Sequence, residues 1–212
     1  MIPVPADYDG DFKTDLGVYD LPTGMWYLYA PFTGGFTEFQ FGNAACIPVP
    51  GDYDGDGKYD IAVYHTADYT WYIYTMRGQF AMFQFGRPGC VPLPGDYDGD
   101  GRFDFAVFET PAALWHIYTW TGQFASGQFG WPGIIPVTGD YDGDGRRDAG
   151  FYDPATGMWF IYCWSGQFYQ AQLWQDTGAP ALAYARSRAF TDDTIRYAFG
   201  YSDGRGLLDY LK

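Results

Sequence analysis

The sequence predicts an all-β fold built from repeats of about 44 residues, and three features of the chain lead to this prediction. An acidic loop recurs four times, a tryptophan recurs at the same interval, and short strand-like segments lie between turns rich in Gly and Pro. The acidic loops begin 45, 44 and 44 residues apart, and the tryptophans keep the same steps: Trp26, Trp71, Trp115 and Trp159. Repeats of this length with four strands are typical of the blades of a β-propeller.

Each repeat contains four strand-like segments, which are clearest in the second copy at residues 46–50, 61–64, 71–74 and 80–86. The first segment carries prolines and therefore suits an edge or entry strand, because proline cannot donate a hydrogen bond to a sheet. Trp71 and Ile73 alternate with Tyr72 and Tyr74, so both faces of the third segment are apolar or aromatic. A sheet with two such faces must pack between neighbours, as propeller blades do.

The acidic loops have the pattern Asp-x-Asp-Gly-Asp-x-x-x-Asp, which predicts calcium sites. Carboxylates at loop positions 1, 3 and 5 place hard oxygen ligands on one side of a tight turn, and position 9 adds a fourth. Ca²⁺ takes about six to eight oxygens, and Mg²⁺ is less suited because it resists dehydration and prefers a stricter octahedron. The sixteen predicted ligands are Asp7, Asp9, Asp11, Asp15, Asp52, Asp54, Asp56, Asp60, Asp96, Asp98, Asp100, Asp104, Asp140, Asp142, Asp144 and Asp148.

A single Asp-Gly run usually marks a solvated turn. Four copies with every carboxylate intact favour four Ca²⁺ sites, because four clustered carboxylates would otherwise repel one another. Gly57, Gly101 and Gly145 stand at loop position 6, where a sharp turn is expected. Phe12 holds this position in the first loop, so we expect that loop to be strained or turned differently.

The formal net charge is −14, but sixteen of the 26 acidic residues lie in the four loops. Four bound Ca²⁺ ions would more than halve this charge. No basic stripe is present to meet phosphates, which argues against nucleic acid as a partner. No run of about 18 apolar residues predicts a membrane span. The first repeat begins directly at Met1, without a signal peptide, and we expect the start of the chain to be a domain or processing boundary.

The three cysteines predict neither a disulfide framework nor a metal site. Cys46 and Cys90 share a repeat position that Ile134 holds in a later copy, which favours a small, buried, apolar role. Cys163 has no counterpart among the residues at its repeat position.

The chain is expected to form one domain, 1–212, with repeats at about 1–45, 46–89, 90–133 and 134–177 and a degenerate fifth repeat at 178–212. In the fifth copy, only the position 9 carboxylate, Asp192, remains, while Arg186 and Arg188 replace ligands 3 and 5. This loop should bind no cation. The segments 194–199 and 207–211 suit a hairpin, with a short helix from Thr191 as the alternative.

The Phe-Gly element, the Gly-x-x-x-Pro-x-Pro lead-in and the Asp-Tyr-Asp-Gly-Asp-Gly loop resemble FG-GAP/VCBS repeats. The resemblance is clear over residues 1–172 and degenerate over 173–212. It implies a calcium-loaded β-propeller like those of integrin α subunits and bacterial surface proteins, with the sixteen aspartates as ligands. Well-known members have seven blades, whereas this chain holds four and an incomplete fifth. We expect a closed ring of these blades, and an open arc completed by a neighbouring subunit is the alternative.

These features predict a non-catalytic, extracellular or cell-surface scaffold or adhesion module that calcium stabilises. Its expected partners are a protein or glycan on a surface, with self-assembly as an alternative and without membrane insertion. The other functions considered are a structural subunit of an extracellular polymer and a lectin-like propeller, the latter because Trp120, Trp131, Trp164 and Trp174 lie outside the repeated Trp position. No enzyme is expected, because neither His65 nor His116 recurs or pairs with a recognisable nucleophile.

Overall fold

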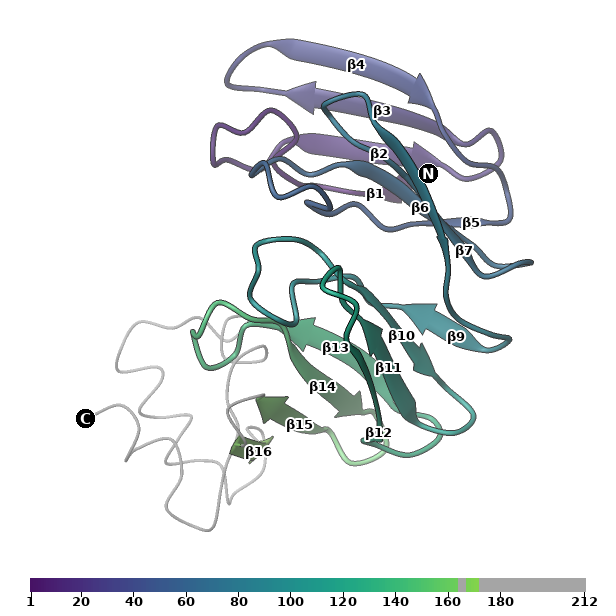
Figure 1. Ribbon diagram of the computed structural model, residues 1–212, viewed down its shortest axis with the longest axis vertical. Helices are drawn as coiled ribbons and strands as arrows, with labels where there is room; N and C mark the ends of the chain where they lie inside the picture. The colour runs from purple at the N-terminus through teal and green to yellow at the C-terminus, as the bar shows by residue number, and fades with distance from the viewer. Residues whose placement is uncertain (164–166, 172–212) are drawn as a thin grey trace. The chain divides into compact units, whose positions relative to one another are not determined.

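The computed structural model describes residues 1–163 and the backbone of residues 167–171, and this part of the chain consists of strands and loops without a helix (Figure 1). It divides into two units, Met1–Phe129 and Gly130–Lys212, which are described separately below. The predicted hairpin or helix near the C-terminus, together with Arg186, Arg188 and Asp192, lies outside the described residues. Among the described residues, no helix has the length and apolar character needed to cross a membrane.

The unit Met1–Phe129 contains three antiparallel sheets of four strands each, and every sheet follows chain order from one edge to the other. The first sheet contains β1 (Ile2–Pro3), β2 (Leu16–Asp20), β3 (Met25–Ala30) and β4 (Gly35–Gln40). The second contains β5 (Cys46–Pro48), β6 (Ile61–His65), β7 (Thr70–Tyr74) and β8 (Phe80–Gln84). The third contains β9 (Cys90–Pro92), β10 (Phe105–Glu109), β11 (Leu114–Tyr118) and β12 (Phe124–Gln128).

The second unit contains one more sheet of the same kind, with β13 (Ile135–Gly139), β14 (Asp148–Asp153), β15 (Met158–Cys163) and β16 (Gln167–Ala171). The predicted fold class is thereby confirmed: the protein is all-β, and its repeats form four-stranded blades of the β-propeller type. Closure of a ring, the domain bounds 1–212 and the degenerate fifth repeat stay predictions.

The recurring tryptophan anchors each of the first three blades. Its ring is almost completely buried, and its indole Nε1 donates a hydrogen bond to the carbonyl of the Phe in the Phe-Gly element. The three bonds measure 2.9 Å for Trp26 to Phe41, 3.0 Å for Trp71 to Phe85 and 2.9 Å for Trp115 to Phe129. In these three blades the end of the outer strand is therefore tied back to the third strand, which explains why the two sequence markers recur together.

The glycine of the Phe-Gly element is required by a close approach. Gly86 has a φ of 132°, and a Cβ at this position would collide with the Tyr64 hydroxyl. Gly42 has the same relation to Tyr19 in the preceding blade. Since both conformations lie in the region that L residues rarely adopt, glycine satisfies both constraints.

The two apolar, buried faces predicted for the third segment are not shared by the outermost strands of the first three blades. All side chains of β12 are exposed, and in β4 only Phe39 is partly buried. The third strands follow the expected pattern, with Trp71 and Ile73 buried and Tyr72 and Tyr74 half-buried in β7. The outermost strands β4, β8 and β12 each form one edge of their sheet and pair on one side only.

Candidate metal centres and neighbouring sites

The first aspartate of each acidic loop organises the turn through backbone hydrogen bonds. Asp52 Oδ1 accepts hydrogen bonds from the amides of Gly55 and Asp56, and its Oδ2 accepts one from Gly57. The other three loops repeat the bond from the position 4 glycine amide at 2.6–2.7 Å. The loops thus fold around the side chain of position 1, which explains the requirement for a short acidic residue there.

The aspartate at position 9 closes the loop from the far side. Its Oδ2 accepts a hydrogen bond from the amide of the loop tyrosine in all four copies, at 2.8–2.9 Å. In the first three copies the tyrosine hydroxyl donates to a carbonyl of the preceding segment, as Tyr53 does to Val49 at 2.7 Å. In these three copies the loop tyrosine is therefore buried, and its two hydrogen bonds join the loop to the preceding segment.

Carboxylate oxygens converge in all four loops at metal-ligand spacing. In the first three loops, oxygens from positions 1, 3 and 9 lie within 4.8 Å of one another. The groups are Asp7, Asp9 and Asp15; Asp52, Asp54 and Asp60; and Asp96, Asp98 and Asp104. The position 5 aspartates Asp11, Asp56 and Asp100 are not in these groups, and each accepts the amide of position 7 at 2.8–2.9 Å. Several acidic groups can therefore hold a metal ion, with three carboxylates as the core of each site in these loops.

The donor set fits a hard cation. Both carboxylate oxygens of Asp54 are shielded from solvent and accept no hydrogen bond from a described residue, although Oδ1 lies 3.4 Å from the Arg77 Nη1. A shielded carboxylate without donors is costly, and a cation bound by oxygen ligands would remove that cost. The loop carbonyls and water would complete a calcium shell.

The pKa values of two position 9 carboxyls show that the charged carboxylate is unfavourable in the loops without a cation. The pKa of Asp104 is raised to about 7, chiefly by burial and also by the neighbouring Asp98 and Asp100, against the hydrogen bonds from the Tyr97 and Trp120 amides. Burial likewise raises the pKa of Asp60 to about 6. A bound cation would reverse both effects because it favours the charged carboxylate.

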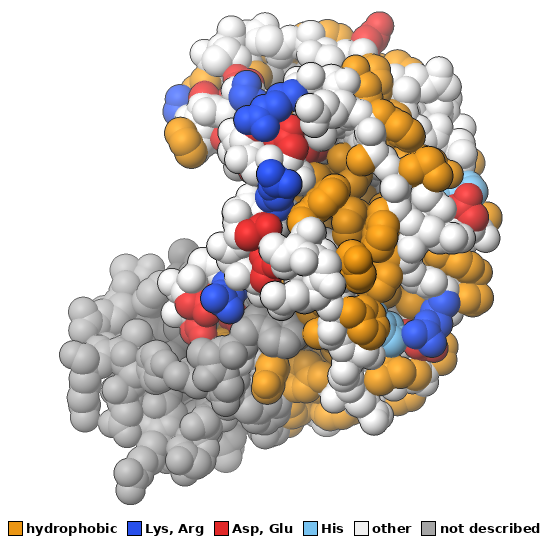
Figure 2. All heavy atoms as spheres, viewed as in Figure 1, with side chains coloured by type: hydrophobic (Ala, Val, Ile, Leu, Met, Phe, Trp, Pro, Cys, Tyr) orange, Lys and Arg blue, Asp and Glu red, His pale blue; other side chains and the backbone are white. Residues whose placement is uncertain are grey.

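Successive loops are bonded to each other within the unit Met1–Phe129. The Tyr59 amide in the second loop donates to the Asp7 carbonyl in the first at 2.7 Å, and the Phe103 amide in the third donates to the Asp52 carbonyl in the second at 2.6 Å. Figure 2 shows acidic and basic side chains close together on one face of the molecule. Each link uses the backbone of position 1, so an ion in one loop would also stiffen its junction with the next blade.

The fourth loop, in the second unit, differs from the others. Oxygens of Asp140, Asp142 and Asp144 form one group, and Asp142, Asp148 and Cys163 form another. The Cys163 thiol donates to Asp148 Oδ2 at 3.3 Å, and burial together with Asp148 raises the pKa of this thiol well above its ordinary value. This contact could not be predicted from the repeat pattern, because Cys163 has no counterpart in the other repeats. A protonated thiol is a poor ligand for Ca²⁺, so its place beside Asp148 is that of a hydrogen-bond donor.

The turn at loop position 6 confirms the expectation for Phe12. Gly57, Gly101 and Gly145 have φ values of 84°, 86° and 88°, and Phe12 is held at 63° with its side chain 93% exposed. We expect Phe12→Gly to stabilise the protein by about 1 kcal/mol, because it relieves a left-handed conformation and loses little packing. The matched change Gly57→Ala should destabilise by about the same amount, since a Cβ there meets no atom within 4 Å and only the conformation is penalised. Urea unfolding measures both, and a less stable Phe12→Gly protein would contradict this account.

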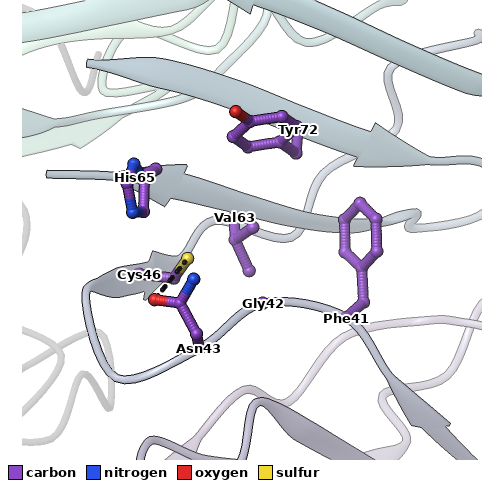
Figure 3. Close-up of a pocket in the computed structure, with 7 residues that line it drawn as sticks. All are labelled: Phe41, Gly42, Asn43, Cys46, Val63, His65 and Tyr72. Atoms are coloured by element: carbon purple, nitrogen blue, oxygen red, sulfur yellow. Dashed lines mark hydrogen bonds between the residues drawn. The ribbon is translucent and has the colours of Figure 1, made fainter. Parts of the chain in front are cut away.

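A pocket of about 320 Å³ lies between the first and second blades (Figure 3). The rings of Phe41 and Tyr72 and the polar groups of Asn43 and His65 line it, together with Gly42, Cys46 and Val63. Asn43 Oδ1 accepts hydrogen bonds from the Ala45 amide at 2.8 Å and the Cys46 thiol at 3.7 Å. His65 Nδ1 lies 2.7 Å from Asp68 Oδ1, a contact that lowers the Asp68 pKa. In the neutral tautomer that carries its proton on Nδ1, His65 donates to Asp68 and presents Nε2 as an acceptor.

A polar cluster occupies the corresponding place in the third blade, where Arg87, Glu109 and His116 stand at the positions of Asn43, His65 and Tyr72. His116 is 5% exposed, and its Nδ1 lies 2.9 Å from the Ser126 hydroxyl. Its Nε2 lies 3.3 Å from Glu109 Oε2 and 3.2 Å from Arg87 Nη2. The expectation that His116 has no candidate nucleophile beside it is therefore wrong. The antiparallel register that pairs His116 with Ser126 brings them together, and the sequence did not fix that register.

The chemistry of this cluster depends on the imidazole proton. With the proton on Nε2, His116 donates to Glu109 and accepts from Ser126, as a general base does. With the proton on Nδ1, it donates to Ser126 and accepts from Arg87, which holds the hydroxyl as a structural partner. Acyl transfer also requires donors for the developing oxyanion, and Arg87 contacts the ring nitrogen remote from Ser126. The cluster therefore supplies a nucleophile and a base without an oxyanion site shown beside them.

Comparison with known proteins supports the repeat assignment. Residues 52–107 match the sequence model of the family described as FG-GAP-like repeat, a segment that includes the second acidic loop and the third. This match confirms the resemblance to FG-GAP repeats for that part of the chain. No curated protein sequence matches the chain at a significant level.

Three solved structures with a similar fold are those of virginiamycin B or streptogramin B lyases. Selenomethionine-substituted virginiamycin B lyase from Staphylococcus aureus is 13% identical with a TM-score of 0.53, over 81% of this chain and 56% of that one. A streptogramin B lyase structure has a TM-score of 0.54 at 13% identity, over 81% and 55%. A catalytically inactive variant of the S. aureus lyase with quinupristin gives 0.54 at 13%, over 82% and 57%. The chain thus spans little more than half the length of these proteins, and at this identity the likeness concerns the fold.

These structures correct the expectation that the chain is not an enzyme. Their propeller fold carries lyase activity, so neither the fold nor the repeat pattern excludes catalysis. The sequence lacks the recognised motifs for hydrolases, zinc sites and phosphate loops. Such motifs identify only some classes of enzyme. None of them matches the cluster of Ser126, His116 and Glu109 in sequence.

Proposed function

We propose that the protein is a calcium-stabilised propeller scaffold that presents its blade surfaces to a protein or glycan outside the cell. The observation that carries the proposal is the link between successive loops, in which the backbone of one acidic loop accepts a hydrogen bond from the next. An ion in each loop would fix both the loop and its junction with the neighbouring blade. Extracellular calcium, at millimolar concentration, is high enough to fill even weak sites of this kind.

Equilibrium dialysis with radiolabelled calcium tests the proposal. We expect four bound ions per chain at millimolar calcium, and the substitution Asp98→Asn should remove one of them, because it takes a carboxylate from the third loop. Asp68→Asn serves as the control, since this aspartate contacts His65 and lies in no acidic loop. Absence of bound calcium at millimolar concentration would contradict the proposal.

The pocket between the first two blades favours carbohydrate binding as a second candidate function. It combines two aromatic rings with an amide and an imidazole, which suits the apolar face and the hydroxyl groups of a sugar ring. Trp120 and Trp131 are exposed, at 37% and 42%, and lie outside this pocket. Trp120 donates to the Phe103 carbonyl, and Trp131 packs on Phe151 and Phe160. Trp164 and Trp174 lie outside the described residues.

A glycan array followed by calorimetry tests this second function. We expect Tyr72→Ala to weaken binding of a retained saccharide about tenfold or more, because it removes one aromatic wall of the pocket. Phe124→Ala, which removes an exposed ring from the third blade, should leave the affinity unchanged. An array without any retained saccharide, or equal losses in both variants, would rule out the pocket as a lectin site.

A polymeric role stays an alternative prediction. The outermost strands β4, β8 and β12 each pair on one side only, and such edges can pair with another chain. Size-exclusion chromatography at increasing protein concentration separates the two cases, since a strictly monomeric chain would exclude the polymer.

A further inference from the structure

The three acidic loops of the unit Met1–Phe129 differ in one contact that comes from outside the loop. In each of the first three blades, the turn between the third and fourth strands places one residue, just before a glycine, beside the position 3 aspartate. This residue is Thr33 in the first blade, Arg77 in the second and Thr121 in the third. Ser165 holds the equivalent sequence position in the fourth repeat, outside the described residues.

The two threonines make the same hydrogen bond. Thr33 Oγ1 donates to Asp9 Oδ2 at 2.7 Å, and Thr121 Oγ1 donates to Asp98 Oδ2 at 2.9 Å. A hydroxyl is neutral and also carries lone pairs, so it can remain beside the carboxylate when a cation binds. In the first and third loops the overhanging residue is therefore compatible with a filled site.

Arg77 makes ion pairs instead. Its Nη1 lies 3.4 Å from Asp54 Oδ1, and its Nε lies 3.3 Å from Asp56 Oδ2. The two carboxylate side chains are only 12% and 7% exposed, whereas the Arg77 side chain is 55% exposed. The guanidinium thus contacts nearly buried ligands of the predicted site, while the rest of the Arg77 side chain is largely exposed to solvent.

We propose that Arg77 is a tethered cation that competes with calcium for the second loop, so that this loop is the weak and exchangeable site of the three. The inference rests on the proposed calcium function. A calcium ion entering the loop must displace the guanidinium from Asp54 and Asp56, because two positive charges cannot share the same carboxylates at contact distance. The first and third loops fill at lower calcium concentration, and the second fills only after Arg77 has moved aside.

The same contact gives the second loop a charge partner when calcium is scarce. With its guanidinium in place, the loop keeps a positive charge beside two of its carboxylates, Asp54 and Asp56. In the first loop Lys13 pairs with Asp11 at 3.4 Å, but the position 3 aspartates of the first and third loops receive a neutral hydroxyl at the place of the guanidinium. The chain therefore binds calcium in two ranges of concentration. The second loop and its junction with the neighbouring blade change only in the higher range.

Reciprocal exchange of the two side chains tests this inference. We expect Arg77→Thr to tighten one calcium site about tenfold, a modest change because Arg77 is largely exposed and its ion pairs are screened. Thr121→Arg should weaken one site by a similar factor. Isothermal titration calorimetry gives the stepwise affinities, and circular dichroism confirms that both variants are folded. Melting in chelator supplies a second readout, in which Arg77→Thr should be less stable than the parent chain.

A control in the second loop assigns the effect to its site. In an Asp54→Asn background, which removes a ligand of this loop, Arg77→Thr should no longer change any calcium affinity. Unchanged stepwise affinities in the Arg77→Thr chain with Asp54 intact would overturn the inference while leaving the calcium function standing. Absence of calcium binding in both the parent and Arg77→Thr chains would contradict the proposed function itself, and this inference with it.

Discussion

Removal of calcium with EDTA is expected to lower the melting temperature of the chain by on the order of 15 °C. A ligand that binds only the folded state stabilises it by about 2.7 kcal/mol per site at a hundredfold excess over its dissociation constant. The three linked loops of Met1–Phe129 would together contribute about 8 kcal/mol on this basis. Since a domain is typically stable by about 5–15 kcal/mol, loss of this contribution should be a large fraction of the total.

Differential scanning calorimetry with and without EDTA measures this effect. Calcium added back in excess should restore the melting temperature, and magnesium at the same concentration should restore less of it, because Mg²⁺ gives up its water reluctantly. The chain with Asp98→Asn should lose less on chelation than the parent, since it has one fewer complete site. An unchanged melting temperature in EDTA would show that the acidic loops are held by their own hydrogen bonds.

The substitution Trp71→Ala is expected to destabilise the protein by about 3–5 kcal/mol. Trp71 is fully buried, its ring lies 5.3 Å from Tyr64 and 5.5 Å from Phe105 of the next blade, and its Nε1 satisfies the Phe85 carbonyl. The change therefore opens a cavity between the second and third blades and releases the outer strand of the second. Urea unfolding followed by circular dichroism measures the loss.

Phe36→Ala is the matched control for this change. Phe36 is an aromatic residue of the outermost strand β4 and is 62% exposed, so its removal should alter stability by less than about 0.5 kcal/mol. Equal losses in the two variants would contradict the assignment of the recurring Trp to the core and of the outer strand to the surface.

The sequence predicted those parts of the structure whose residues recur in successive repeats. The Trp and Phe-Gly markers recur because one hydrogen bond joins them, and the acidic loop recurs because Asp52 and Asp60 bind the loop backbone from both sides. Four strands in a blade followed from the same period. The glycine at loop position 6 also predicted a sharp turn there, and the structure has a positive φ at this position both for Gly57 and for Phe12.

The features that could not be predicted occur in a single repeat and depend on contacts across it. Arg77 reaches the second loop from a turn more than twenty residues away in sequence, and His116 meets Ser126 only because β11 and β12 pair in one register. The exposure of the outermost strands likewise depends on which strand forms the edge. A repeat pattern averages over its copies, so it reveals what the copies share and hides what distinguishes one of them.

A structure from crystals grown in millimolar calcium tests most directly the central claim that the acidic loops are calcium sites. The account predicts an ion in each of the first three acidic loops at about 2.3–2.6 Å from the carboxylates of positions 1, 3 and 9. In the second loop Arg77 should have left Asp54 and Asp56. Loops that contain water alone, with the Arg77 guanidinium still on Asp54 and Asp56, would contradict the claim that these loops are calcium sites.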